Sequence, residues 1–131
     1  MTLEQGIRAA VIADSNLNAI ISGRIYHERM PQNATMPAIL FSRVSTSQNS
    51  MLDGIDTLTQ VRIQLDIYGD TSASVRDLST KLRTLLNGHA GDLGGSAVQF
   101  ARLDSEIDAG FFDGDEERRR IISDYMFFLH E

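Results

Sequence analysis

The sequence predicts an α+β fold, an antiparallel sheet of about four strands with two α-helices packed on one face. The stretch LTQVRIQLDIY alternates apolar and polar residues, which is the period of a half-buried strand. The next stretch, GDTSASVRDLSTKLRTLLNG, spaces its apolar residues by three and four, which is the period of an amphipathic helix. A second helical pattern opens the chain and β-rich segments close it. Together these patterns favour helices stacked on a sheet.

The first helix is expected to begin at a capping box. Thr2 can cap the first turn, and Gln5 stands three positions later to complete the box. The apolar residues of LEQGIRAAV then form one face. Asn16 and Asn18 are expected to end this helix before a short apolar piece at residues 19–21.

Both prolines of the chain lie in GRIYHERMPQNATMPAILFSRVS, at Pro31 and Pro37. Proline fixes φ and removes a backbone donor, so neither position fits a helix or the centre of a sheet. The pair predicts an extended, shaped connector that leads into a first strand at AILFSRVS.

The first strand and residues 58–68 are predicted to form a long hairpin. The polar run STSQNS is expected to interrupt the first strand, and Asp53 with Gly54 marks a turn. In the second arm, the apolar residues at 61, 63, 65 and 67 share one face and define the predicted core side.

The second helix is predicted to begin at Thr71 or Ser72 and to end at Asn87 and Gly88. A glycine-rich turn then leads to a third strand at residues 97–107 and a fourth at 119–131, joined by DAGFFDGDEERR. In the fourth strand, Met126 and Phe128 fall on the face opposite the core side. That face is unusually apolar for a surface.

Length and composition predict one domain over residues 1–131. The absence of cysteine excludes disulfides and thiolate metal sites. No signal-peptide pattern and no membrane-spanning run occurs, so a soluble, unexported protein without membrane contacts is expected. The net charge of −6 works against non-specific binding to a polyanion such as DNA.

No catalytic or cofactor signature occurs, so the sequence predicts no enzyme and no cofactor. The glycines of GHAGDLGGS lack the lysine and hydroxyl of a phosphate-binding loop and are interpreted as a plain turn. The three histidines follow no metal-ligand spacing. Asp104, Glu106 and Asp108 alternate along a strand and are expected to point the same way. They form either oxygen ligands for a hard cation or, as we favour, a charged edge that discourages aggregation.

The run DGDEERRR follows Phe111 and Phe112. Two adjacent phenylalanines of an extended hairpin cannot both point inward, so one is exposed or covered by another chain, or both pack under their own loop. With the apolar face at Met126 and Phe128, this favours an oligomer over a monomer.

The chain carries four stretches in this order: RIY before the proline connector, LDG at residues 52–54, VRIQLDIYGDTSASVRDLSTKLRTLL and RRIISDYMFF. In the order of these stretches it resembles the tail-completion, or head-to-tail joining, proteins of long-tailed bacteriophages and prophages. The resemblance implies an antiparallel sheet with two helices and a ring, usually hexameric, at the head-proximal end of the tail. It further implies a tail tube protein and a head connector or stopper as partners, DNA passing through the lumen without specific binding, and a place in the virion neck after assembly in the host cytoplasm.

Residues at the connector, the two hairpin ends and the apolar face are the candidate interface. They are Pro31, Pro37, Leu52, Asp53, Phe111, Phe112, Asp113, Asp115, Glu116, Glu117, Met126 and Phe128. The alternative function is a small α+β ligand-binding or regulatory domain without catalytic activity.

Overall fold

The computed structural model describes residues 2–50, 57–113 and 116–130, and the side chains within 2–48, 58–110 and 118–130. The elements in chain order are α1 (Leu3–Ala13), α2 (Ser15–Ile21), β1 (Ile25–His27), β2 (Ala38–Ser50), β3 (Thr57–Gly69), α3 (Ser72–Leu86), β4 (Gly91–Leu93), β5 (Ser96–Val98), β6 (Phe100–Asp113) and β7 (Glu116–Leu129).

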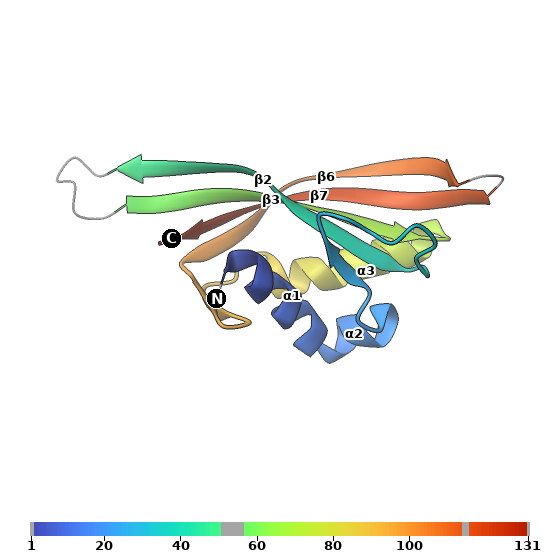
Figure 1. Cartoon of the computed structure of the whole chain (residues 1–131), viewed down its shortest axis with the longest axis horizontal. Helices are drawn as coiled ribbons and strands as arrows, with labels where there is room; N and C mark the ends of the chain where they lie inside the picture. Colours follow the sequence, from blue (N-terminus) through green and yellow to red (C-terminus); the bar gives the residue numbers. More distant parts are fainter. Residues whose placement is uncertain (1, 51–56, 114–115, 131) are drawn as a thin grey trace.

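The main sheet has the order β1-β2-β3-β7-β6, and β4 pairs with β5 in a separate small sheet. All neighbours in the main sheet are antiparallel except β1, which runs parallel to β2. The β2–β3 and β6–β7 hairpins point toward opposite ends of the sheet (Figure 1). The predicted α+β class is confirmed, with more strands than expected and a third helix.

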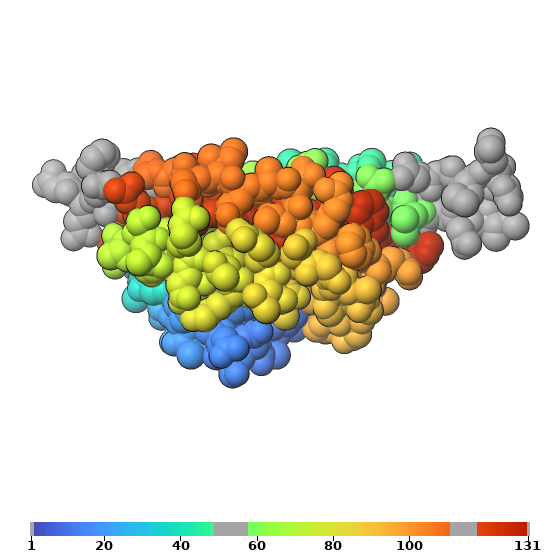
Figure 2. Space-filling view, turned by 180° about the vertical axis from the view of Figure 1, so that it is seen from behind, coloured from blue at the N-terminus to red at the C-terminus, as the bar shows by residue number. Residues whose placement is uncertain are grey.

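Helices α1 and α3 cover one face of the sheet, under its middle (Figures 1 and 2). The predicted core side of β3 is confirmed, because its four apolar residues are fully buried and alternate with more polar neighbours. They face the buried stripe of α3. That stripe consists of Val75, Leu78, Leu82 and Leu86, whereas Leu85 packs only at the rim of the core.

Helix α1 begins as predicted and ends earlier than predicted. The Thr2 hydroxyl accepts a hydrogen bond from the Gln5 amide at 3.2 Å, and the Gln5 side chain accepts one from the Thr2 amide at 2.9 Å. The predicted stop at Asn16 and Asn18 is wrong, because both lie within α2. Asp14 ends α1 and caps α2 at once, since its Oδ1 accepts from the backbone amides of the next turn.

Two further expectations are corrected. The polar run at residues 45–50 continues β2, because pairing with β3 satisfies its backbone, and the irregularity falls earlier, between Arg43 and Ser45. The glycine-rich turn contains the β4–β5 hairpin, so the predicted third strand begins as β5 and continues as β6.

Glycines bring α1 and the β4–β5 hairpin into backbone contact. A Cβ at Gly6 would lie 2.5 Å from the Leu93 carbonyl oxygen, and one at Gly94 would lie 2.2 Å from the Gly6 carbonyl oxygen. Gly94 also has a φ of +56°, which disfavours a side chain. These glycines therefore serve close packing between α1 and the hairpin.

We expect Leu82→Ala to lower the free energy of unfolding by about 2 to 5 kcal/mol, because a fully buried side chain is lost and a cavity remains. Lys81→Ala is the matched control on the same helix. It removes an exposed ion pair with Asp77 and should cost about 0.5 kcal/mol or less. Equal denaturation midpoints for the two variants would contradict the assigned core.

We expect Gly6→Ala to lower the free energy of unfolding by about 1 to 3 kcal/mol, because the new methyl group forces α1 away from the hairpin. Gly110→Ala is the control, since its Cβ would come close to the end of the flexible Arg119 side chain, at 3.3 Å, and would otherwise make only an ordinary contact with the Arg118 carbonyl oxygen, at 3.9 Å. Thermal melts should separate the two variants. A Gly6→Ala protein as stable as the parent would show that α1 does not pack this closely.

Candidate interaction surfaces

The outer edge of β6 is covered along its first part only. Gly88 donates its backbone N–H to the Ala101 carbonyl at 2.7 Å, and the Ala101 N–H donates to the His89 carbonyl at 2.9 Å. The Leu103 N–H donates to the Asn87 side chain at 2.9 Å. Within the described ranges, no strand pairs with this edge over residues 105–113.

The outer edge of β2 is also covered in part. Strand β1 pairs only with Ile39, Leu40 and Phe41, and the Glu28 N–H adds one bond to the Phe41 carbonyl at 2.8 Å. From residue 42 to residue 50, β2 has no described neighbour on that side. The sheet thus has two edges that are open to a further strand over part of their length within the described residues.

Large apolar side chains are exposed at these edges. Among the described residues, the exposed large apolar side chains are Val44, Phe100 and Ile107, at 53%, 42% and 58%. Val44 lies at the irregularity of β2 within its open stretch, and Ile107 lies in the open stretch of β6. Exposed apolar groups on an unpaired edge are typical of a surface that another chain covers.

The predicted apolar face is confirmed at Met126 and Phe128, which are half-buried on the sheet face away from the helices. The Phe128 ring lies 6.4 Å from the Phe100 ring, and the Arg102 guanidinium carbon lies 5.9 Å from the Phe128 ring centre. This uncovered face therefore carries a small aromatic cluster with a cation beside it.

Arginines and aspartates alternate next to that cluster. Arg62 donates to Asp104 at 2.8 Å, and Arg102 donates to the other oxygen of Asp104 at 2.9 Å. Asp124 lies 4.0 Å from Arg62. The hydrogen bonds from Arg62 and then Arg102 hold the pKa of Asp104 below its usual value.

The expectation that Asp104, Glu106 and Asp108 point the same way is wrong. A register shift between Leu103 and Ser105 leaves Asp104 with the arginines of the uncovered face. Glu106 and Asp108 instead face α3, where Arg83 and Arg76 donate to them. Across the described ranges, no three potential metal-ligating side chains gather at one place.

The proline connector folds over one end of the uncovered face. Arg24 fixes its end through a 2.9 Å hydrogen bond from Nε to the Pro37 carbonyl. Pro37 is half-buried and Pro31 is exposed. Connector residues 30–34 and 36 line a hollow of about 420 Å³ with Tyr68 and Arg118.

Tyr68 and Asp66 are buried in this region, although their sequence pattern places them on the exposed face of β3. Each is only 8% exposed, and the Tyr68 hydroxyl donates to Asp66 at 3.4 Å. Burial raises the pKa of Tyr68. The strand period alone gives no sign of this burial. The pair of prolines is the one sequence signal that a shaped segment lies nearby.

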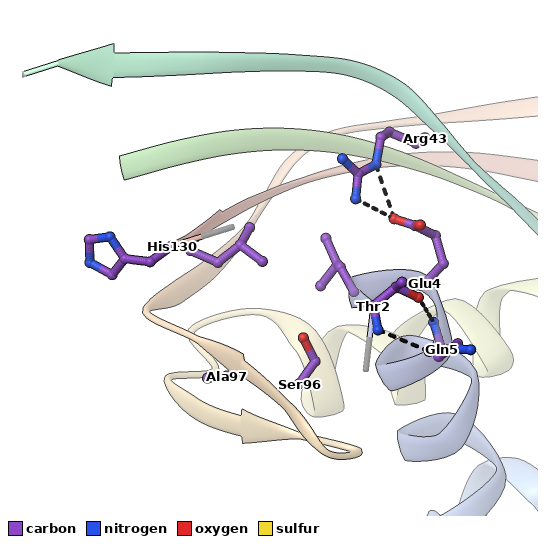
Figure 3. Close-up of a pocket in the computed structure, with 9 residues that line it drawn as sticks. Thr2, Glu4, Gln5, Arg43, Ser96, Ala97 and His130 are labelled. Carbon is purple, nitrogen blue, oxygen red and sulfur yellow. Dashed lines mark hydrogen bonds and ion pairs between the residues drawn. The ribbon is translucent and has the colours of Figure 1, made fainter. Parts of the chain in front are cut away.

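A second hollow, of about 720 Å³, opens between the start of α1, β5 and the end of β7 (Figure 3). Its charged groups are paired within the chain, since Arg43 donates to Glu4 from Nη2 at 2.6 Å and from Nε at 3.0 Å. This pair ties α1 to β2. Of the helices in the described ranges, none combines the length and apolar character needed to cross a bilayer.

The remaining predicted residues lie at the hairpin ends. Leu52, Asp53 and Asp115 lie outside the described residues. Phe111, Phe112 and Asp113 form the end of β6 and Glu116 and Glu117 the start of β7, with side chains outside the described part. The structure thus places Met126 and Phe128 on the same face of β7, and it places Pro31 and Pro37 in a connector at one end of the sheet.

These observations define an α+β protein whose main sheet has two partly open edges. The family described as tail completion protein gp17 matches residues 5–130, and the chain belongs to that family. The predicted resemblance is therefore confirmed, and the chain is a structural tail protein of a bacteriophage virion.

The fold also resembles that of a solved chain. That structure is described as the virion of a native gene transfer agent (GTA) particle, and its chain superposes with a TM-score of 0.69 at 15% identity, over 95% of each chain. At this identity the likeness shows the fold alone. No protein with a curated description matches the sequence.

We expect Arg62→Ala to raise the pKa of Asp104 toward its ordinary value, because the strongest hydrogen bond to its carboxylate is lost. A depressed pKa stabilises the fold above the ordinary Asp pKa, and this stabilisation is lost as the pH falls through the depressed value. Carboxyl-carbon NMR titration measures the shift, with Arg8→Ala as the control. An Asp104 pKa unchanged by Arg62→Ala would contradict the described pairing.

Proposed function

We propose that the chain is the subunit of a ring, hexameric as the family resemblance implies, that completes the head-proximal end of a phage tail. The ring stops growth of the tail tube and joins the tube to the head connector. The observation that carries this proposal is the pair of open edges on opposite sides of one sheet. A ring needs two different complementary surfaces on each subunit, and one sheet with two unlike edges supplies them.

The distribution of charge supports contacts at both ends of the sheet. The six carboxylates next to the two hairpin turns equal the whole net charge of −6, so the rest of the chain has as many acidic as basic residues. They are Asp53, Asp56, Asp113, Asp115, Glu116 and Glu117. Because the two hairpins point in opposite directions (Figure 1), one acidic rim would face the tail tube and the other the head connector.

The uncovered sheet face fits a channel through which DNA passes without specific binding. Two of its cations, Arg62 and Arg102, are paired with Asp104, which reduces the positive charge offered to phosphates. Helices cover the opposite face. The connector at Pro31 and Pro37 and the aromatic cluster at Phe128 would contribute to contacts between subunits or with the partner rings.

We expect that changing Asp113, Asp115, Glu116 and Glu117 together to lysine leaves the melting temperature nearly unaltered, because charges at a hairpin turn contribute little when water surrounds them. The variant should nevertheless block virion completion in a complementation test, leaving filled heads beside unattached or overlong tails. Electron microscopy of the lysate and a plaque count measure the effect.

The matched control replaces the same four residues with asparagine and glutamine, which removes the charge without reversing it. We expect it to give an intermediate yield of infectious particles. A normal yield of infectious particles from the lysine variant would show that the end of this hairpin is an ordinary solvated surface without a partner contact. Normal virions from a strain without the gene would contradict the proposed function itself.

A further inference from the structure

We propose that neighbouring subunits join by antiparallel strand pairing, with residues 105–113 of β6 in one copy against residues 42–50 of β2 in the next. The inference rests on the proposed ring and names the surface through which it closes. Its partner is a second copy of this chain.

The direction of the strands fits this contact. Three antiparallel steps separate β2 from β6, through β3 and β7, so β2 and β6 run in opposite directions. Rotation about a ring axis keeps all copies in the same sense along that axis. The β6 strand of one copy therefore meets the β2 strand of the next in antiparallel orientation, without inversion of either subunit.

On each edge strand, a segment of the same chain covers one part and leaves the rest open. On β6 the cover is the segment of residues 87–89, and on β2 it is β1. Main-chain hydrogen bonds from an added strand would continue where these covers end. The open stretch of β2 beyond Arg43 reads VSTSQNS, and after the irregularity at Val44 it contains no charge and no proline, which are two of the usual devices that keep an edge from pairing.

The two open stretches lie toward opposite ends of the sheet, next to opposite hairpins (Figure 1). If neighbouring copies stood at the same height along the ring axis, the open part of β6 would meet β1 of the next copy, which already covers that end of β2. Pairing of the two open stretches therefore requires the next copy to be shifted along the strand direction by roughly half a strand length. In a closed ring such a stagger tilts the strands from the axis, as in barrels, where the tilt is about 35 to 45°.

The described side chains at the contact, within residues 42–48 and 105–110, are compatible with burial. The contact covers Val44 on one copy and Ile107 on the other, which are the two most exposed large apolar side chains among the described residues. On β6, Glu106 and Asp108 are engaged by Arg83 and Arg76 of their own α3, so they bring little uncompensated charge to the edge.

The test uses the lack of cysteine in the chain. Ser47→Cys and Ala109→Cys place two thiols on the uncovered face of the two open stretches, far apart within one subunit and close together across the proposed contact. Purified virions that carry both substitutions are treated with a short bismaleimide. We expect a ladder of covalent oligomers that extends beyond the dimer, and no cross-linking of either single variant.

Ser47→Cys with Phe100→Cys is the matched control. Phe100 lies on the same face of β6, in the part of the strand that residues 87–89 cover, so no ladder is expected. Dimers formed by a single variant would show a symmetric contact and would overturn the pairing. The pairing would also be overturned if the Ser47→Cys/Ala109→Cys chains stayed unlinked in virions whose ring is visible by electron microscopy. The proposed function would stand in that case. Virions without any ring of this chain would overturn both.

Discussion

The antiparallel pairing of β3 with β7 is the interaction on which the rest of the structure depends. It joins two hairpins that point in opposite directions, and it aligns buried residues of both strands, such as Ile63 with Tyr125, under the helices. Because α1 and α3 cover only one face, under the middle of the sheet, that pairing fixes one core and leaves the other face and both edges to further contacts. Burial in this core also raises the pKa of Tyr125 to about 12.

The parts of the fold that local chemistry controls were predictable from the sequence. Strand β3 and helix α3 each bury one side, so their periods of two and 3.6 are visible. The capping box at Thr2 needs only residues within one turn. Helix α2 was missed because Asp14 ends one helix and starts another, and β1 was missed because its three residues form a strand only beside β2. The β4–β5 hairpin could not be predicted, because its glycines fit a plain turn equally well.

Surfaces were predictable only where they follow the strand period. Met126 and Phe128 fall on the uncovered face as expected, because the period of β7 is unbroken. Asp104 does not follow its neighbours, since a register shift depends on the facing strand. Edge positions depend on strand order, which no local pattern encodes, so the open stretches of β2 and β6 became visible only in the fold. The interface roles of the hairpin ends stay predictions.

A reconstruction of the head–tail junction of the virion by cryo-electron microscopy tests the central claim most directly. The account predicts a closed ring of this chain between the tail tube and the head connector, with a sheet that is continuous from copy to copy and faces the channel, and with α1 and α3 outside. A ring whose helices face the channel, copies joined through the helices rather than the edges of β2 and β6, or copies located away from the junction would contradict it.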